Sequence, residues 1–376
     1  MFLKNNGLLI LWLTLLLMLL TVCESGNKKS ITGDYIDRKP GNQKSITAHF
    51  DSIIPYKVGI GDASYLFAGR YRTVSAFSVV KFPQLTKELL DSLEKATVEF
   101  NVGNTWRDGP AVFGLFETTS DWSDSVSLEP EVFLSNLTSP ISTFSDTASS
   151  IGSLDFVLEP EFFTTMATWN GNGSFLVTNT GEGNTMVGMS SVYSNYKPYI
   201  EFIVRKAQGV LDTTKTTCTL TNYYFNTGFD NAAPGSGLTG MVSNADARAF
   251  VLKMTLPDSL PAASTINGCI VKLNILQSII PGSTGFEIGF YLLTSTVTTF
   301  TSAQYNDTFT IQKTVTEADN SISLDLKDFI DSWHMINAKN YGILVKPITI
   351  CNSPSQIICA PEDSITIFYM GIPEVE

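Results

Sequence analysis

The stretch AFSVVKF at residues 76–82 combines apolar and β-branched residues in the manner of a buried β-strand. A second run of this kind, ATVEFNV at residues 96–102, follows after one short helix-like segment at residues 85–93. Gly, Pro, Asn and Asp separate further runs at residues 111–116, 174–178 and 199–204. Many short strands divided by turn residues are typical of a sandwich or barrel. The sequence therefore predicts an all-β fold.

The second half of the chain repeats this pattern. The runs AFVLKM at residues 249–254 and CIVKLNI at residues 269–275 correspond to AFSVVKF and ATVEFNV in the first half. The triplet SLD occurs at residues 153–155 and again at 323–325. Each triplet leads to a tryptophan, Trp169 or Trp333, and then to an Asn/Gly turn and a strand. Such self-similarity indicates an internal duplication. We expect two tandem antiparallel β-sandwich domains, jelly-roll-like, at residues 48–205 and 218–376, joined by a linker at residues 206–217.

The first 23 residues are typical of an export signal. Lys4 precedes an apolar run at residues 7–22, and Cys23 stands between this run and a charged, polar stretch. A cysteine at this position predicts a lipoprotein-type signal helix, residues 1–23, with Cys23 as the lipidated residue. The polar residues 24–47 then form a flexible tether. A signal anchor or a single transmembrane helix, which needs about 20 apolar residues, is the alternative.

Composition narrows the range of partners. Apolar residues make up 43% of the chain, charged residues only 16%, and the net charge is −12 at pH 7. Affinity for nucleic acid comes from Lys and Arg on phosphates, so we expect no nucleic-acid partner. The same charge opposes adhesion to anionic lipid, so contact with a membrane is expected only through the N-terminal lipid.

Four further cysteines, Cys218, Cys269, Cys351 and Cys359, all lie in the second half. Export permits disulfides, and four cysteines allow three pairings. We favour Cys351 with Cys359, which closes a short loop, and this leaves Cys218 with Cys269. A zinc site and free buried thiols are the alternatives, although the sequence has no CxxC spacing and only two histidines, His49 and His334.

The segment LDLKDFIDSW at residues 324–333, followed by NYGILVK at residues 340–346, resembles the most typical stretch of the DNRLRE domain. That domain is a β-sandwich module of bacterial and archaeal surface proteins and is similar to carbohydrate-binding modules. LFAG at residues 66–69 and the strand that ends at Phe82 before Pro83 resemble its early elements. The first copy departs from the pattern, because WNGN at residues 169–172 replaces the Asn-Tyr-Gly run. The resemblance implies a surface protein that binds polysaccharide.

Catalytic patterns are absent from the sequence. It contains no GxSxG or HExxH, and neither histidine belongs to a recognisable triad. The carboxylate pairs Glu159/Glu161 and Asp121/Asp124 are typical of helix caps and loop charges rather than of a glycosidase pair. We therefore expect a non-enzyme without cofactors, with calcium at an acidic loop near Asp62 or Asp230 as an alternative.

Aromatic residues in polar loops are the candidates for a sugar site, because a flat ring carries an apolar face that a sugar ring can cover. The candidates for carbohydrate binding are Trp106, Trp122, Tyr193 and Tyr196. Trp106 lies in the polar loop GNTWRDG at residues 103–109, and its alternative role is that of a lid on the sandwich.

These expectations describe a membrane-anchored surface lipoprotein of the bacterial cell envelope, held by lipid in the outer membrane or at the cell surface, that binds polysaccharide or surface matrix. A structural or adhesive protein that contacts other envelope proteins is one alternative, and a glycan-processing enzyme is the other.

Overall fold

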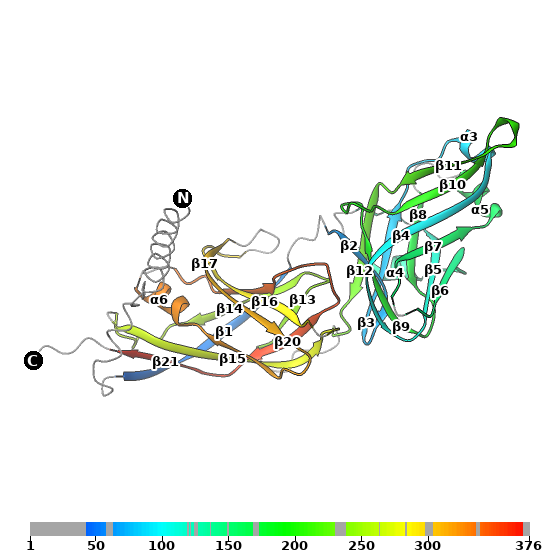
Figure 1. The fold of residues 1–376 in the computed structure, drawn as a ribbon. Helices are drawn as coiled ribbons and strands as arrows, with labels where there is room; N and C mark the ends of the chain where they lie inside the picture. Colours follow the sequence, from blue (N-terminus) through cyan, green and yellow to red (C-terminus); the bar gives the residue numbers. More distant parts are fainter. Residues whose placement is uncertain are drawn as a thin grey trace, which may run out of the picture.

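The computed structural model of the chain describes residues 43–57, 63–118, 120, 122–123, 127–135, 137–148, 150–167, 173–229, 238–262, 264–282, 284–297, 304–335 and 339–370. The predicted signal helix, Cys23 and Trp169 lie outside these residues, as do Asp62, Asp121, Asp124 and Asp230. Two large antiparallel sheets account for most of what is described (Figure 1). The expected all-β, sandwich-like class is therefore confirmed.

One sheet belongs to the first unit of the molecule. Its path runs β11-β10-β4-β9-β2-β3-β8-β5-β6, with β12 on β3 and β7 on β4. The strands are β2 (Tyr65–Tyr71), β3 (Val74–Lys81), β4 (Leu93–Asp108), β5 (Ala111–Thr118), β6 (Ser142–Asp146), β7 (Ser153–Leu158), β8 (Ser174–Asn179), β9 (Asn184–Ser190), β10 (Tyr199–Arg205), β11 (Leu211–Thr217) and β12 (Leu220–Asn226). The helices are α3 (Lys87–Asp91), α4 (Pro130–Leu134), α5 (Pro160–Ala167) and the 3-10 turn η2 (Ala207–Gly209).

The other sheet forms the second unit. Its path runs β1-β21-β15-β20-β13-β14-β19-β16-β17, with β18 on β15. The strands are β1 (Gln43–Lys57), β13 (Gly240–Ser243), β14 (Arg248–Thr255), β15 (Thr265–Ile279), β16 (Phe286–Leu293), β17 (Tyr305–Val315), β18 (Ser321–Asp325), β19 (Ile343–Pro347), β20 (Gln356–Pro361) and β21 (Ile365–Met370), with helix α6 (Lys327–Met335). From β10 and β21 onward the two paths follow the same order, strand for strand.

Apolar side chains along the strands build a large core in each unit. Phe100 on β4, Phe156 on β7 and Phe175 on β8 are fully buried in the first core. Phe290 on β16 and Trp333 on α6 lie in the second core. Full burial of one such side chain stabilises the fold by about 1.5–3 kcal/mol, so each of these rings contributes substantially to its unit.

The expected boundaries at residues 48–205, 206–217 and 218–376 do not coincide with the strand pairing. Residues 43–57, assigned to the tether and the first domain, form β1, which pairs with β21 and β14 of the second unit. Residues 211–217, assigned to the linker, form β11 on β10, and β12 pairs with β3. The reason is that β11 exposes most of its side chains as an edge strand, so it lacks the apolar alternation that reveals a buried strand.

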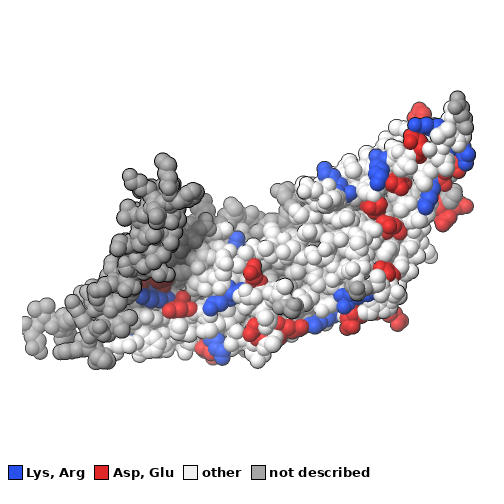
Figure 2. Space-filling view, in the orientation of Figure 1, with Lys and Arg blue, Asp and Glu red and all other residues white. Residues whose placement is uncertain are grey.

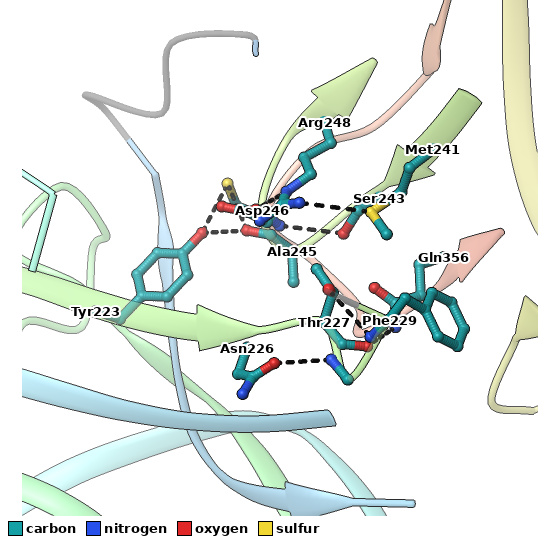
Figure 3. A network of polar contacts seen from close by, with 12 residues as sticks. Tyr223, Asn226, Thr227, Phe229, Met241, Ser243, Ala245, Asp246, Arg248 and Gln356 are labelled. Carbon is teal, nitrogen blue, oxygen red and sulfur yellow. Dashed lines mark hydrogen bonds and ion pairs between the residues drawn. The ribbon is translucent and has the colours of Figure 1, made fainter. Parts of the chain in front are cut away.

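The two units share a buried interface. On the first-unit side, Phe67 of β2 packs edge-on against Tyr223 and Phe225 of β12, with ring centroids 5.5 and 5.8 Å apart. The same apolar cluster contains second-unit residues, namely Ala245, Ile279 and Cys351. Figure 3 shows the polar contacts at this junction, where the Tyr223 hydroxyl donates to the Ala245 carbonyl and Gln356 Nε2 donates to the Thr227 carbonyl. The interface is therefore packed and hydrogen-bonded.

Candidate functional site

Trp122 does not offer a face to solvent. It is only 9% exposed, and its indole Nε1–H donates to Ser174 Oγ at 3.1 Å. The ring covers the outer side of the first sheet together with Phe77, Phe116 and Leu176. The expectation of a sugar platform at Trp122 is corrected by this placement. Its polar neighbours in sequence suggested a solvated loop, but the apolar outward residues of β3, β5 and β8 need a cover.

Trp106 lies on β4 and is half-buried. Its ring stacks on the buried ring of Phe67, with centroids 5.7 Å apart and an interplanar angle of 27°. Trp106 also lies against Gly188 of β9, where an added Cβ would be 3.2 Å from the indole. Trp106 thus packs beside the junction of the two units, in the manner of the lid that was its alternative role.

Tyr193 and Tyr196 are the two candidates that remain open to solvent, with 44% and 69% of their surface exposed. Both follow β9, and both line an open hollow with a volume of about 430 Å³. We call this feature the tyrosine hollow. Its lining residues are Ser64, Tyr65, Asn101, Gly103, Ser190, Tyr193, Ser194, Asn195 and Tyr196.

Hydrogen bonds fix the loop that carries the two tyrosines. The Ser191 amide donates to the Ser64 carbonyl at 3.0 Å, and Ser191 Oγ donates to the Ala63 carbonyl at 2.5 Å. Ser191 Oγ also accepts from the Tyr193 amide at 3.0 Å, and Ser194 Oγ accepts from the Tyr196 amide at 3.1 Å. Such serine turns hold the backbone in one conformation. The loop is therefore built before any ligand arrives.

Tyr65 and Asn101 complete the hollow from β2 and β4. Gly103 stands at a register shift between β4 and β9, and a Cβ there would lie 2.6 Å from Cε1 of Tyr65. The glycine thus provides the space in which the Tyr65 ring lies. Sequence reasoning missed Tyr65 and Asn101, although Asn101 is the outward residue between the buried Phe100 and Val102, a position that strand alternation identifies.

The chemistry of the hollow is neutral. Its lining side chains are phenols, hydroxyls and primary amides, and none of them carries a charge near pH 7. Phenol rings offer apolar faces, while the amides and hydroxyls offer both donors and acceptors. The arrangement suits a polar, uncharged ligand that has an apolar face.

The expected disulfides are not formed: Cys218, Cys269, Cys351 and Cys359 are all buried thiols outside any disulfide. Cys359 pairs with Gly240 at one end of β13. The Cys351 amide donates to the Asn244 carbonyl just beyond the other end of that strand. Gly240 and Asn244 are about 13 Å apart at 3.3 Å per residue. A disulfide needs Cα atoms within about 7 Å. Cys218 lies in the core of the first unit and Cys269 in that of the second.

Both histidines have structural contacts. His49 Nδ1 lies 2.9 Å from the Asp363 carbonyl oxygen, and His334 Nε2 lies 3.1 Å from Ser264 Oγ. Within the described ranges, no three His, Cys, Asp or Glu side chains gather where they could hold a metal ion. No helix in the described part of the chain is both long and apolar enough to cross a bilayer.

Comparison with known proteins gave no match, either to a family model, to a curated protein or to a solved structure. The resemblance to the DNRLRE domain therefore stays a prediction from the quoted residues.

Proposed function

We propose that the protein is a non-enzymatic surface lipoprotein of the bacterial cell envelope that binds neutral polysaccharide in the tyrosine hollow. Cys23 carries the lipid that anchors the chain, and the two sandwiches project from the membrane. Three observations support the ligand class: the tyrosine rings, the uncharged lining and the prebuilt loop of the hollow.

The single observation that carries the proposal is the exposure of Tyr193 and Tyr196 beside Asn101 and Asn195 in one hollow. A sugar ring presents C–H groups on its faces and hydroxyls at its rim. The former pack on phenol rings, and the latter exchange hydrogen bonds with amides and hydroxyls. On the face shown in Figure 2, Lys, Arg, Asp and Glu are sparse, so this face has little charge with which to attract a charged polymer.

The test is retention on a panel of immobilised polysaccharides, followed by titration of those that bind. We expect Tyr196→Ala to weaken binding about tenfold, which corresponds to about 1.4 kcal/mol, a typical value for a lost aromatic contact. Tyr196→Phe keeps the ring and is expected to retain most of the affinity. Phe368→Ala, which removes a ring that is 37% exposed on the second unit, is the matched control.

Two outcomes would contradict the proposal. Retention on no glycan, combined with capture of an envelope protein, would favour the structural or adhesive alternative. Release of reducing sugar from a bound polysaccharide would favour an enzyme. The anchor is tested separately by the intact mass of the membrane-bound form, which is expected to show cleavage before Cys23 and attached acyl chains.

A further inference from the structure

We propose that the two units have exchanged their first strands, so that β1 of the first repeat completes the second unit and β11 with β12 of the second repeat completes the first. The strand-binding surface between β21 and β14 is then a specific site for the segment Gln43–Lys57. Its partner is the other repeat of the same chain. This inference does not depend on the polysaccharide proposal.

Chain order provides the first argument. In the first repeat β1 precedes β2, and in the second repeat β11 and β12 precede β13, so the two segments stand at the same place in the duplicated sequence. The strands that follow are arranged alike, because β10-β4-β9-β2-β3-β8-β5-β6 corresponds to β21-β15-β20-β13-β14-β19-β16-β17. Equivalent segments that simply stayed with their own repeat would place β1 on β10 and β3. Instead β1 lies on β21 and β14.

Register provides the second argument. β1 pairs Ala48 with Ile365 of β21 and Tyr56 with Ala249 of β14. β11 pairs Thr216 with Ile200 of β10, and β12 pairs Phe225 with Ala76 of β3. Ala76 and Ala249 are the first residues of the repeated runs AFSVVKF and AFVLKM. The position of β1 in the second unit therefore matches that of β11 and β12 in the first, both at the β21 or β10 end and at the β14 or β3 end.

Burial provides the third argument. Ile200, Phe202 and Val204 are the buried residues of β10, and Ile365, Ile367 and Tyr369 are those of β21, so the acceptor strands present the same alternation. On the inserted strand, Ala48 and Phe50 enter the second core, where Ile46 and Ile53 pack against it. β1 is thus a structural part of the second unit. Its main-chain pairing with β21 and β14 and the burial of its apolar side chains make the site specific for this strand.

The exchange also explains the close junction. Because each repeat contributes a strand to the other, the chain passes between the units before β2 and again after β12. Tyr223 of β12, the strand before the second crossing, reaches the second unit, where its hydroxyl donates to the Ala245 carbonyl. Two tandem sandwiches with unexchanged strands need only a single linker.

Cysteine cross-linking in the full chain tests the exchange. Thr47 lies opposite the exposed Thr366, and Lys215 lies opposite Glu201, with Nζ and Oε2 3.2 Å apart. Because Thr47 corresponds to Lys215 and Thr366 to Glu201, four double-cysteine variants separate the two arrangements. Thr47→Cys/Thr366→Cys and Lys215→Cys/Glu201→Cys report exchange, and Thr47→Cys/Glu201→Cys and Lys215→Cys/Thr366→Cys report its absence.

We expect the first two variants to close an intrachain bridge nearly completely with a short bismaleimide, and the other two to stay at background. All four positions lie at the surface, so the folded state of each variant can be checked by its circular dichroism. The reverse pattern would overturn the proposal. A cross-linked dimer from the first two variants would also overturn it, because the strand would then come from a second copy of the chain.

Discussion

At the scale of single residues, burial decides the chemistry of the thiols. Removal from water raises the pKa values of Cys218, Cys269 and Cys359 to about 12, because the thiolate loses its hydration. An unfolded cysteine ionises near pH 8.5. The folded state therefore holds these three protons over a pH range in which the unfolded state releases them.

The sign of the pH dependence follows from this difference. The stability contributed by neutral burial is fully present below about pH 8.5 and is lost as the pH rises toward 12. We expect the free energy of unfolding to fall between pH 8 and pH 10, on the order of 2 kcal/mol for each thiol. Urea titrations at both pH values measure it. The free energy of unfolding of the matched variant Cys359→Val is expected to fall less over this pH range. An equal fall in the wild type and the variant would show that the Cys359 thiol does not contribute to the pH dependence.

Exposure of aromatic residues could be predicted from the sequence only in part. Tyr193 and Tyr196 stand among Ser, Asn and Lys, and their polar surroundings correctly indicated open rings. Trp122 stands among Asp and Ser as well, yet its ring is buried against Phe77 and Leu176, which are remote in sequence. A loop's own composition does not reveal which sheet face it covers, so the distinction required the fold.

At the scale of elements, β12 links the two units. It is paired with β3 of the first unit, and it directs Tyr223 toward the second. The Tyr223 hydroxyl donates to the Ala245 carbonyl and lies 3.2 Å from Cys351 Sγ. Burial raises the pKa of Tyr223 well above 10, so the phenol remains a donor throughout the neutral range.

Replacement of this hydroxyl tests the coupling between units. We expect Tyr223→Phe to lower the free energy of unfolding by about 1–3 kcal/mol, since it leaves the buried Ala245 carbonyl with only the weak Cys351 thiol as a donor, at 3.7 Å. We also expect the thermal transition to broaden or divide, because the lost bond joins two units. Calorimetry measures both effects.

The control for Tyr223→Phe is Tyr305→Phe, which removes a phenol that accepts from Lys346 Nζ within the second unit. That variant is expected to shift the transition without dividing it. A Tyr223→Phe protein with an unchanged, single transition would show that the hydroxyl does not couple the units.

Strands with continuous apolar runs were predictable, and strands that complete another repeat were not. AFSVVKF and AFVLKM became β3 and β14, as their apolar runs indicated. The Thr-rich residues 211–217 gave no such signal, because an edge strand buries little. For β1 no local pattern can tell which of two similar sandwiches it enters, since both acceptors show the same alternation.

At the scale of the whole molecule, the position of β1 reverses the order of the units relative to the N-terminus. Gln43 pairs with Met370, which also pairs with Thr265 at the start of β15. Ile279, at the other end of β15, packs in the core shared with the first unit. β15 has 15 residues and spans about 45 Å at 3.3 Å per residue. The chain therefore enters the described structure at the end of the second unit that is remote from the tyrosine hollow (Figure 1).

This geometry makes a prediction for the lipid-anchored protein, and it rests on the proposed anchor at Cys23. On the sequence-based expectation that the 19 residues 24–42 act as a tether between Cys23 and β1, their mean end-to-end distance is about 25 Å, less than the length of β15. The second unit is then expected to lie near the bilayer and the first to project outward.

A fluorophore on Thr366→Cys in β21 should transfer energy to acceptor-labelled lipid in vesicles severalfold more efficiently than one on Thr213→Cys in β11. Both positions are exposed, whereas the native thiols are buried and react slowly. Equal transfer from the two sites, or stronger transfer from Thr213, would mean that the first unit lies against the membrane, which would leave the tyrosine hollow facing lipid headgroups instead of the surrounding matrix.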